Sequence, residues 1–327
     1  MTKSALVCGA GGFIGAHLVK SLKNRGYRVR AVDRKYPEFG PSPADEYVVQ
    51  DLRDPVAVGQ TIDQSFDEVY QLAAEMGGAE YTYVGSNDIE IMKNSTMIHL
   101  NVLEACRKAS VKRIFFSSSA CIYPTRNQED PDKPQCAESL AYPAEPDSEY
   151  GWEKLYGERL YLTYGRHSPM RTRIARYHNV FGPEGAWRGG REKAPAALCR
   201  KIAAARSGDE IEIIGDGKQS RSFLFFSEAI EGTFRLMQSD IDEPLNLGSE
   251  ELVTIDQLAD LIMAIAGKSL AKKYVPGPVG VRGRNSDNTL IERRLGWKPS
   301  LSLQQGLEAT YAWVETQVTA AAQSERA

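Results

Sequence analysis

The stretch of sequence that decides the fold is residues 4–15, which read SALVCGAGGFIG. An apolar run ending at Cys8 is followed by Gly9, Gly12 and Gly15, and then by a helical pattern. Glycines at this spacing allow a tight turn and a close approach of the backbone to a pyrophosphate, which the N-terminus of the next helix attracts. The same glycines can also serve only to pack the helix on the strand, so the surrounding chain has to decide between the two interpretations.

The first half of the chain alternates short β-branched runs with longer helical patterns. This alternation is typical of a parallel sheet with crossover helices. We therefore predict an α/β fold with a doubly wound parallel sheet of the Rossmann type, whose ligands lie at the carboxyl ends of its strands. The predicted strands are Ala5–Cys8, Arg28–Val32, Glu46–Gln50, Glu68–Leu72, Arg113–Ser117 and Arg171–Tyr177, and the predicted helices include Gly12–Lys23, Asp88–Ala109 and Ser148–Arg166.

Beyond residue 178 the pattern loosens and indicates a smaller α/β lobe that binds substrate. We predict a nucleotide-binding domain over 1–178, to which 222–247 returns, and a lobe formed mainly by 179–327. The tail Thr319–Ala327 is rich in alanine and is expected to fray. The other expected elements are a loop at Phe181–Arg191, helices near Ala194–Arg206 and Ser227–Met237, and strands near Ile211–Ile214 and Ser222–Phe225.

Composition excludes several classes of protein. The 327 residues carry a formal net charge of −3, so nucleic acid is not expected as a main partner. No apolar run approaches the roughly 20 residues that span a bilayer. Five cysteines without a CxxC pair and four scattered histidines favour neither disulfides nor a metal site, and the expected compartment is the cytoplasm.

Residues at the ends of the later strands are expected to hold an NAD cofactor. Asp33 follows the glycines by about 20 residues, where a carboxylate accepts hydrogen bonds from an adenosine ribose and repels a 2′-phosphate. The neighbouring Arg34 weakens that preference for NAD over NADP. Asp51 can also be a turn cap, and Ala73 and Ala74 can simply be packing residues. The predicted cofactor residues are Gly9, Gly12, Phe13, Ile14, Gly15, Asp33, Asp51, Leu52 and Ala73, together with Tyr150 and Lys154.

Tyr150 and Lys154 form a Y-x-x-x-K pair, whose i,i+4 spacing places both on one helix face. Ser119 ends a run of three serines after the fifth predicted strand. A phenol titrates near pH 10, and a lysine cation with a positive nicotinamide ring beside it would lower that value toward neutrality. Tyr150 can then take a hydroxyl proton while a hydride leaves for NAD. A surface contact between tyrosine and lysine would give the same spacing.

These residues resemble the extended short-chain dehydrogenase/reductase family, whose members act mostly on nucleotide sugars. Within it, four segments resemble the enzymes that epimerise GDP-mannose at C3 and C5. The segments are 118–124 (SSACIYP), 177–183 (YHNVFGP), 189–197 (GGREKAPAA) and 280–288 (GVRGRNSDN). The chain departs from the family at Cys8, where threonine is usual, and at Ala79–Ser86, which has extra residues.

The resemblance implies roles for individual residues. Ser119, Tyr150 and Lys154 would oxidise and re-reduce C4, and Cys121 and Lys193 would be the acid/base pair. It also implies a homodimer that pairs the helices predicted at 88–109 and 148–166. The implied contacts to a GDP-sugar are Gly77, Ser119, Ala120, Cys121, Asn179, Glu192, Lys193, Ala194, Lys201, Gln219, Arg221 and Arg282, with Arg284 a further addition.

The implied chemistry suits these groups. A C4 ketone makes the hydrogens on C3 and C5 acidic, so one transient oxidation explains inversion at two centres. Each inversion removes a proton from one face and returns one to the other, which a single monoprotic group cannot do. A cysteine thiol, with an ordinary pKa of about 8.5, can be the base and a lysine the acid. Taken alone, Cys121 is more typical of a small buried residue, Lys193 of a solvated charge, and the arginines of partners for surface carboxylates.

Two other functions remain open at this point. A nucleotide-sugar 4-epimerase needs the cofactor with Ser119, Tyr150 and Lys154, and leaves Cys121 and Lys193 without a role. A non-catalytic NAD sensor is the second alternative, which the intact Ser119, Tyr150 and Lys154 set argues against. A 4,6-dehydratase is disfavoured, because the resemblance would require a Thr-Asp-Glu run at the place where this chain has Ser119-Ala120-Cys121.

Overall fold

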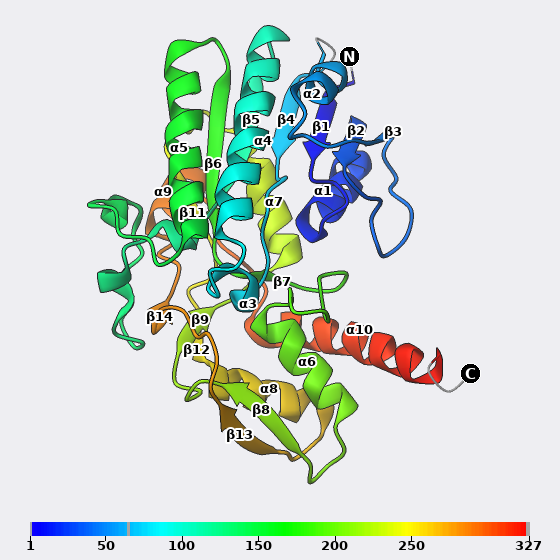
Figure 1. Cartoon of the computed structure of the whole chain (residues 1–327), viewed down its shortest axis with the longest axis vertical. Helices are drawn as coiled ribbons and strands as arrows, with labels where there is room; N and C mark the ends of the chain where they lie inside the picture. Colours follow the sequence, from blue (N-terminus) through cyan, green and yellow to red (C-terminus); the bar gives the residue numbers. More distant parts are fainter. Residues whose placement is uncertain (1, 64–65, 325–327) are drawn as a thin grey trace.

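The chain folds around a seven-stranded sheet in which every neighbouring pair of strands is parallel (Figure 1). A computed structural model describes residues 2–63 and 66–324. The strand order is β11-β6-β5-β4-β1-β2-β3, which confirms the predicted doubly wound α/β fold. The strands are β1 (Ser4–Cys8), β2 (Arg28–Asp33), β3 (Glu46–Val49), β4 (Glu68–Gln71), β5 (Arg113–Ser119), β6 (Arg171–Tyr177) and β11 (Leu245–Leu247).

Helices cover both faces of the sheet, because its central strands are apolar on both sides. All five residues of β1 are buried. One face packs against α1 (Phe13–Asn24) and α7 (Phe226–Gln238), which contact each other. The other packs against α4 (Asp88–Lys108) and α5 (Glu149–His167), which lie side by side in Figure 1, and α2 (Pro55–Thr61) contacts α4.

A smaller lobe lies below the carboxyl ends of the strands (Figure 1). Its core joins α6 (Ala194–Ala204), α8 (Ile255–Ala266) and α10 (Leu303–Ser324). Strand β8 (Glu210–Ile214) pairs with β13 (Ala271–Val275), and β9 (Ser220–Ser222) lies between β12 (Leu252–Thr254) and β14 (Gly283–Arg284). The remaining elements are α3 (Ala79–Thr82), the 3-10 helices η1 (Ala120–Ile122), η2 (Thr125–Gln128) and η3 (Glu138–Ala141), β7 (Val180–Phe181), which pairs with β10 (Leu224–Phe225), and α9 (Thr289–Leu295).

Three details differ from the sequence expectation. β5 continues through the serine run to Ser119, since its ladder with β6 extends to the pair Ser119 and Tyr177 and outweighs the weak strand preference of serine. The strand expected at Ser222–Phe225 is two strands, β9 and β10, which pair with different partners. The tail is helical to Ser324 instead of frayed, because α10 packs against α6 and α8; residues 325–327 lie outside the described part. No helix in the described part is long and apolar enough to cross a membrane.

Candidate active site between the sheet and the smaller lobe

A cavity of about 410 Å³ lies at the carboxyl ends of the strands, beside the glycine-rich turn. Gly9 there has a φ of +82°, a conformation that L side chains rarely adopt. A Cβ on Gly15 would overlap the carbonyl oxygen of Gly9, so only glycine lets α1 start this close to β1. The cavity is lined by the predicted cofactor residues Gly9, Gly12, Phe13, Ile14, Gly15, Asp33, Asp51, Leu52, Ala73, Tyr150 and Lys154.

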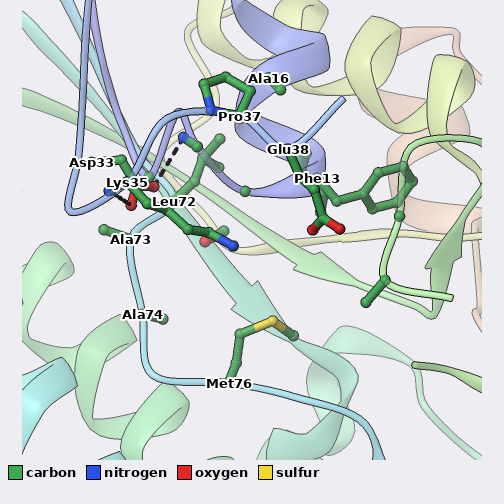
Figure 2. A pocket seen from close by; sticks show the side chains of 18 of the residues that line it. Phe13, Ala16, Asp33, Lys35, Pro37, Glu38, Leu72, Ala73, Ala74 and Met76 are labelled. Carbon is green, nitrogen blue, oxygen red and sulfur yellow. Dashed lines mark hydrogen bonds between the residues drawn. The ribbon is translucent and has the colours of Figure 1, made fainter. Parts of the chain in front are cut away.

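Asp33 fixes the glycine turn from the end of β2. Its Oδ2 accepts a hydrogen bond from the Gly11 N–H at 2.9 Å, and its Oδ1 accepts one from the Lys35 N–H at 3.2 Å. Figure 2 shows Asp33 and Lys35 on one side of the cavity and Ala73 and Ala74 following β4. Gly11 is not among the predicted cofactor residues, although a Cβ there would overlap the Lys35 carbonyl oxygen. The sequence feature that could have identified Gly11 is its position directly before Gly12, in the same glycine-rich turn.

Asp51 combines both roles considered for it. It lines the cavity, and its Oδ1 also accepts the Arg53 N–H at 2.9 Å, as a turn cap does. Hydrogen bonds from the Arg53 side chain hold the pKa of the Asp51 carboxyl below its ordinary value, so the group is an anion at neutral pH. The turn, the carboxylate at the end of β2 and the cavity between them fit a dinucleotide with its pyrophosphate at the start of α1.

Ser119, Tyr150 and Lys154 meet where this cavity borders a second one. The Lys154 Nζ lies 5.6 Å from the centre of the Tyr150 ring and 3.6 Å from the Glu153 carboxylate. Burial raises the pKa of Tyr150, and the nearby Cys121 and Glu153 raise it further, while a hydrogen bond with Ser119 lowers it. Tyr150 is therefore a neutral phenol in the absence of ligands.

The second cavity has a volume of about 280 Å³ and shares part of its wall with the first. The shared residues are Met76, Gly77, Ser119, Tyr150, Tyr177 and Lys193. The structure does not bring Arg282 into this lining; its Nη1 lies 3.0 Å from Oδ1 of Asp216. The predicted substrate residues that line it are Gly77, Ser119, Ala120, Cys121, Asn179, Glu192, Lys193, Ala194, Lys201, Gln219 and Arg221, and Arg284 joins them.

Cys121 and Lys193 reach this cavity from different elements. Cys121 lies in η1, directly after β5, and Lys193 is the N-cap residue of α6. A Cβ on Gly151 would overlap the Cys121 carbonyl oxygen, so only glycine lets the start of α5 lie this close to η1. Burial lowers the pKa of Lys193, with the neighbouring Cys121 opposing and Arg284 adding to the shift. A lysine with a lowered pKa gives up its proton more readily, as a catalytic acid must.

Two arginines line the second cavity. Arg284 is 4% exposed, and its guanidinium lies 2.9 Å from Asp147 and 3.0 Å from the Cys121 sulfur. Arg221 donates to the carbonyl oxygens of Val279 and Val281, and burial lowers its pKa to about 10. Nη1 also donates to the carbonyl oxygens of Ser220 and Arg282, and because carbonyl oxygens do not cancel its charge, Arg221 leaves a positive charge at the cavity wall.

Two polar oxygens of the second cavity are buried without a partner among the described residues. They are Oε2 of Glu192 and Oε1 of Gln219. The other oxygen of Glu192 accepts a hydrogen bond from Arg200 at 2.9 Å. Buried acceptors are normally satisfied, so both oxygens retain the capacity to accept a hydrogen bond.

The model of the NAD-dependent epimerase/dehydratase family matches residues 5–248. The chain belongs to this family. The predicted membership of the extended short-chain dehydrogenases and the predicted NAD dependence are thereby confirmed.

Two plant enzymes are among the proteins that are similar to this chain in sequence. GDP-mannose 3,5-epimerase of Arabidopsis thaliana is 45% identical over 314 residues, which cover 95% of this chain and 82% of the relative. GDP-mannose 3,5-epimerase 1 of Oryza sativa subsp. indica is 46% identical over the same shares. Among solved structures, a tyrosine-to-phenylalanine mutant of UDP-glucuronic acid 4-epimerase from Bacillus cereus, bound to NAD and UDP-4-deoxy-4-fluoro-glucuronic acid, has a TM-score of 0.80 and 27% identity. The match covers 96% of this chain and 99% of that chain.

Proposed function

We propose that this chain is a GDP-mannose 3,5-epimerase that forms GDP-L-galactose and GDP-L-gulose. The observation that carries the proposal is that Cys121 and Lys193 line the second cavity, whose wall includes Ser119 and Tyr150 of the cofactor cavity. Hydride chemistry at C4 and proton chemistry at its neighbours then occur in one continuous space. The two plant relatives of that name support the choice of substrate.

The cofactor residues bind and orient the dinucleotide. The N–H groups at the start of α1 would face the pyrophosphate, and Asp33, placed by the Gly11 and Lys35 N–H groups, would accept the ribose hydroxyls. When bound there, NAD would supply reversible hydride transfer at C4 of the sugar. The Lys154 ammonium and the positive nicotinamide ring would favour the Tyr150 phenolate, which takes the proton of the C4 hydroxyl and gives it back at the end.

The ketone at C4 acidifies C3 and C5, and the second cavity supplies the groups that move their protons. The Cys121 thiolate removes a proton from one face of the ring, and the Lys193 ammonium delivers one to the other. Arg221 would bind the diphosphate, and the free oxygens of Glu192 and Gln219 would accept hydrogen bonds from the sugar nucleotide. We also propose that the other predicted substrate residues that line the second cavity contact the sugar nucleotide. Arg284 would take this role in place of Arg282, which does not line the cavity.

Proton NMR of GDP-mannose incubated with the enzyme in deuterated water tests this function. Deuterium is expected at C3 and C5, because each is deprotonated and reprotonated by groups that exchange with solvent. A 4-epimerase or an NAD sensor would leave both positions protiated, and the absence of deuterium at C3 and C5 would overturn the proposal. Cys121→Ala should abolish the exchange with NAD binding intact, and exchange at the wild-type rate would remove Cys121 from the mechanism.

We also propose that two copies of the chain pair through α4 and α5. Ile89, Met97 and Leu100 form an exposed apolar stripe on α4, and Trp152 and Tyr156 form one on α5. Pairing these stripes between two copies would cover them. Analytical ultracentrifugation should give a dimer for the wild type and a monomer for Leu100→Glu. A monomeric wild type would contradict this assembly.

We also propose which parts of the chain bind the two ligands and in which compartment the protein works. Residues 1–178 with 222–247 would hold NAD, and 179–327 would mainly hold the sugar nucleotide. All five cysteines are free, and Cys121 has to stay reduced to act as a base, which favours the cytoplasm.

A further inference from the structure

A buried carboxylate lies directly behind the lysine of the Y-x-x-x-K pair. Glu153 has no exposed surface, and one of its oxygens, Oε2, is 3.6 Å from the Lys154 Nζ. Its other oxygen, Oε1, is 2.5 Å from Nε2 of His99 on α4. Lys154 lines the cofactor cavity and Glu153 does not, so the carboxylate can influence the cofactor only through space and through Lys154.

The surrounding residues hold this arrangement in place. His99 packs edge-on against the rings of Phe116 and Tyr161, which stack on each other with centroids 4.4 Å apart. One turn after Glu153, a Cβ on Gly157 would lie 2.7 Å from Phe116 and 3.4 Å from the His99 Nε2. Glycine at 157 therefore lets α5 come close enough for the imidazole to reach the carboxylate.

The charges of this group follow from its contacts. Burial lowers the pKa of His99, and its Nδ1 has no partner among the described residues, so the neutral ring donates from Nε2 to Glu153. Burial raises the pKa of Glu153, but Lys154 and His99 outweigh it and the net shift is downward. Glu153 is therefore an anion, and with the Lys154 ammonium it forms a pair without net charge.

A buried ion pair is weak evidence for a role in stability, since apolar residues of similar volume often stabilise a fold as well or better. The position of this pair suits a different role. The nicotinamide ring of oxidised NAD carries a positive charge, which NADH has lost. An ammonium beside the ring disfavours the oxidised form, and a carboxylate behind the ammonium offsets that effect.

We propose that Glu153, held by His99, is a positioning residue that balances the charge of Lys154 and so keeps NADH from being favoured over oxidised NAD. An epimerase has to return the hydride in every turnover, and a cofactor held too tightly in its reduced form would stop after the first half of the reaction. The inference requires NAD as the cofactor but holds for any sugar nucleotide.

The test measures cofactor affinity without any sugar, so its result does not depend on the proposed substrate. Titration calorimetry gives the dissociation constants of oxidised NAD and NADH for wild type and Glu153→Gln. The ratio of the constant for oxidised NAD to that for NADH should rise roughly threefold to tenfold in Glu153→Gln, since an uncompensated charge remains near the ring. Glu149→Gln removes an exposed charge from the first turn of the same helix and should leave the ratio unchanged.

Two variants of His99 keep the proposal testable if Glu153→Gln folds poorly. His99→Leu removes the donor to Glu153 and should raise the ratio, whereas His99→Gln supplies an N–H and should restore it. With sugar nucleotide present, the variants with a raised ratio should also accumulate absorbance at 340 nm. A folded Glu153→Gln or His99→Leu protein with the wild-type ratio would overturn the proposal, and so would a fall in the ratio.

Discussion

The guanidinium of Arg284 approaches the sulfur of Cys121 to 3.0 Å, with Nη1 as the donor. A guanidinium at this distance stabilises negative charge on a neighbouring sulfur. Arg284 also donates from Nε to the Gln128 side chain at 2.6 Å, so its plane is held from two sides. The thiol proposed as the base thus has a fixed cationic neighbour.

Replacing Arg284 by glutamine should slow deuterium incorporation at C3 and C5 by at least about tenfold, because the thiolate loses its charged neighbour. Formation of the C4 ketone, followed as transient absorbance at 340 nm, should change less, since it depends on Tyr150. An equal loss in both measurements would mean that Arg284 serves binding or folding instead of the proton step.

Asp147→Ala should destabilise the fold by about 3 kcal/mol, since it leaves the buried Arg284 without its carboxylate partner. The Tyr83 hydroxyl, from the segment that departs from the family, also donates to Asp147 at 2.8 Å and would lose its acceptor. Urea unfolding measures the effect. Asp132→Ala, at an exposed position, is the control, and a similar small change in both variants would contradict this account.

The pH dependence of isotope exchange should report on Lys193. Burial lowers the pKa of this lysine, and the acid role requires the protonated form. Exchange should therefore fall with rising pH at a midpoint below the ordinary lysine value of about 10.4. Lys193→Arg should abolish exchange, because arginine keeps its proton. A fall only above the ordinary value would contradict the lowered pKa.

Gly11→Ala should weaken NAD binding by at least about tenfold, because the new Cβ would overlap the Lys35 carbonyl and push Asp33 out of place. Gly59→Ala is the matched control: it lies in α2, with nothing within 4 Å of an added Cβ. Alanine in a helix interior should stabilise that variant slightly. Fluorescence titration with NADH compares the two, and equal affinities would show that the turn tolerates a side chain.

Tyr150→Phe should block exchange at C3 and C5 as completely as Cys121→Ala does, because no ketone forms without a group to take the C4 hydroxyl proton. NAD binding should persist, and NADH absorbance should not appear when the sugar nucleotide is added. Exchange that continues in Tyr150→Phe would rule out oxidation as the first step.

Local patterns predicted most of the sheet, because its strands are short apolar runs separated by clear helices. The glycine turn and Asp33 were also predictable, since the turn directly joins β1 to α1 and Asp33 ends β2. The sequence favoured Arg282 over Arg284 as a substrate contact, whereas in the structure Arg284 lines the cavity and Arg282 does not. The pairing of β14 with β9, which sets Arg284 beside Arg221, is a long-range contact that no local pattern encodes. The Glu153 and His99 contact likewise depends on how α4 packs on α5.

The edge strand β11 pairs with β6, although 67 residues separate Tyr177 from Leu245 and α6, β8 and β9 of the smaller lobe lie between them. On the ribosome, the nascent chain therefore exposes the open edge of β6 until α7 and β11 have emerged. Unpaired edges of this kind recruit other strands. Chaperone protection during translation should matter most in the interval between residues 177 and 247, and a truncation inside it should yield insoluble protein.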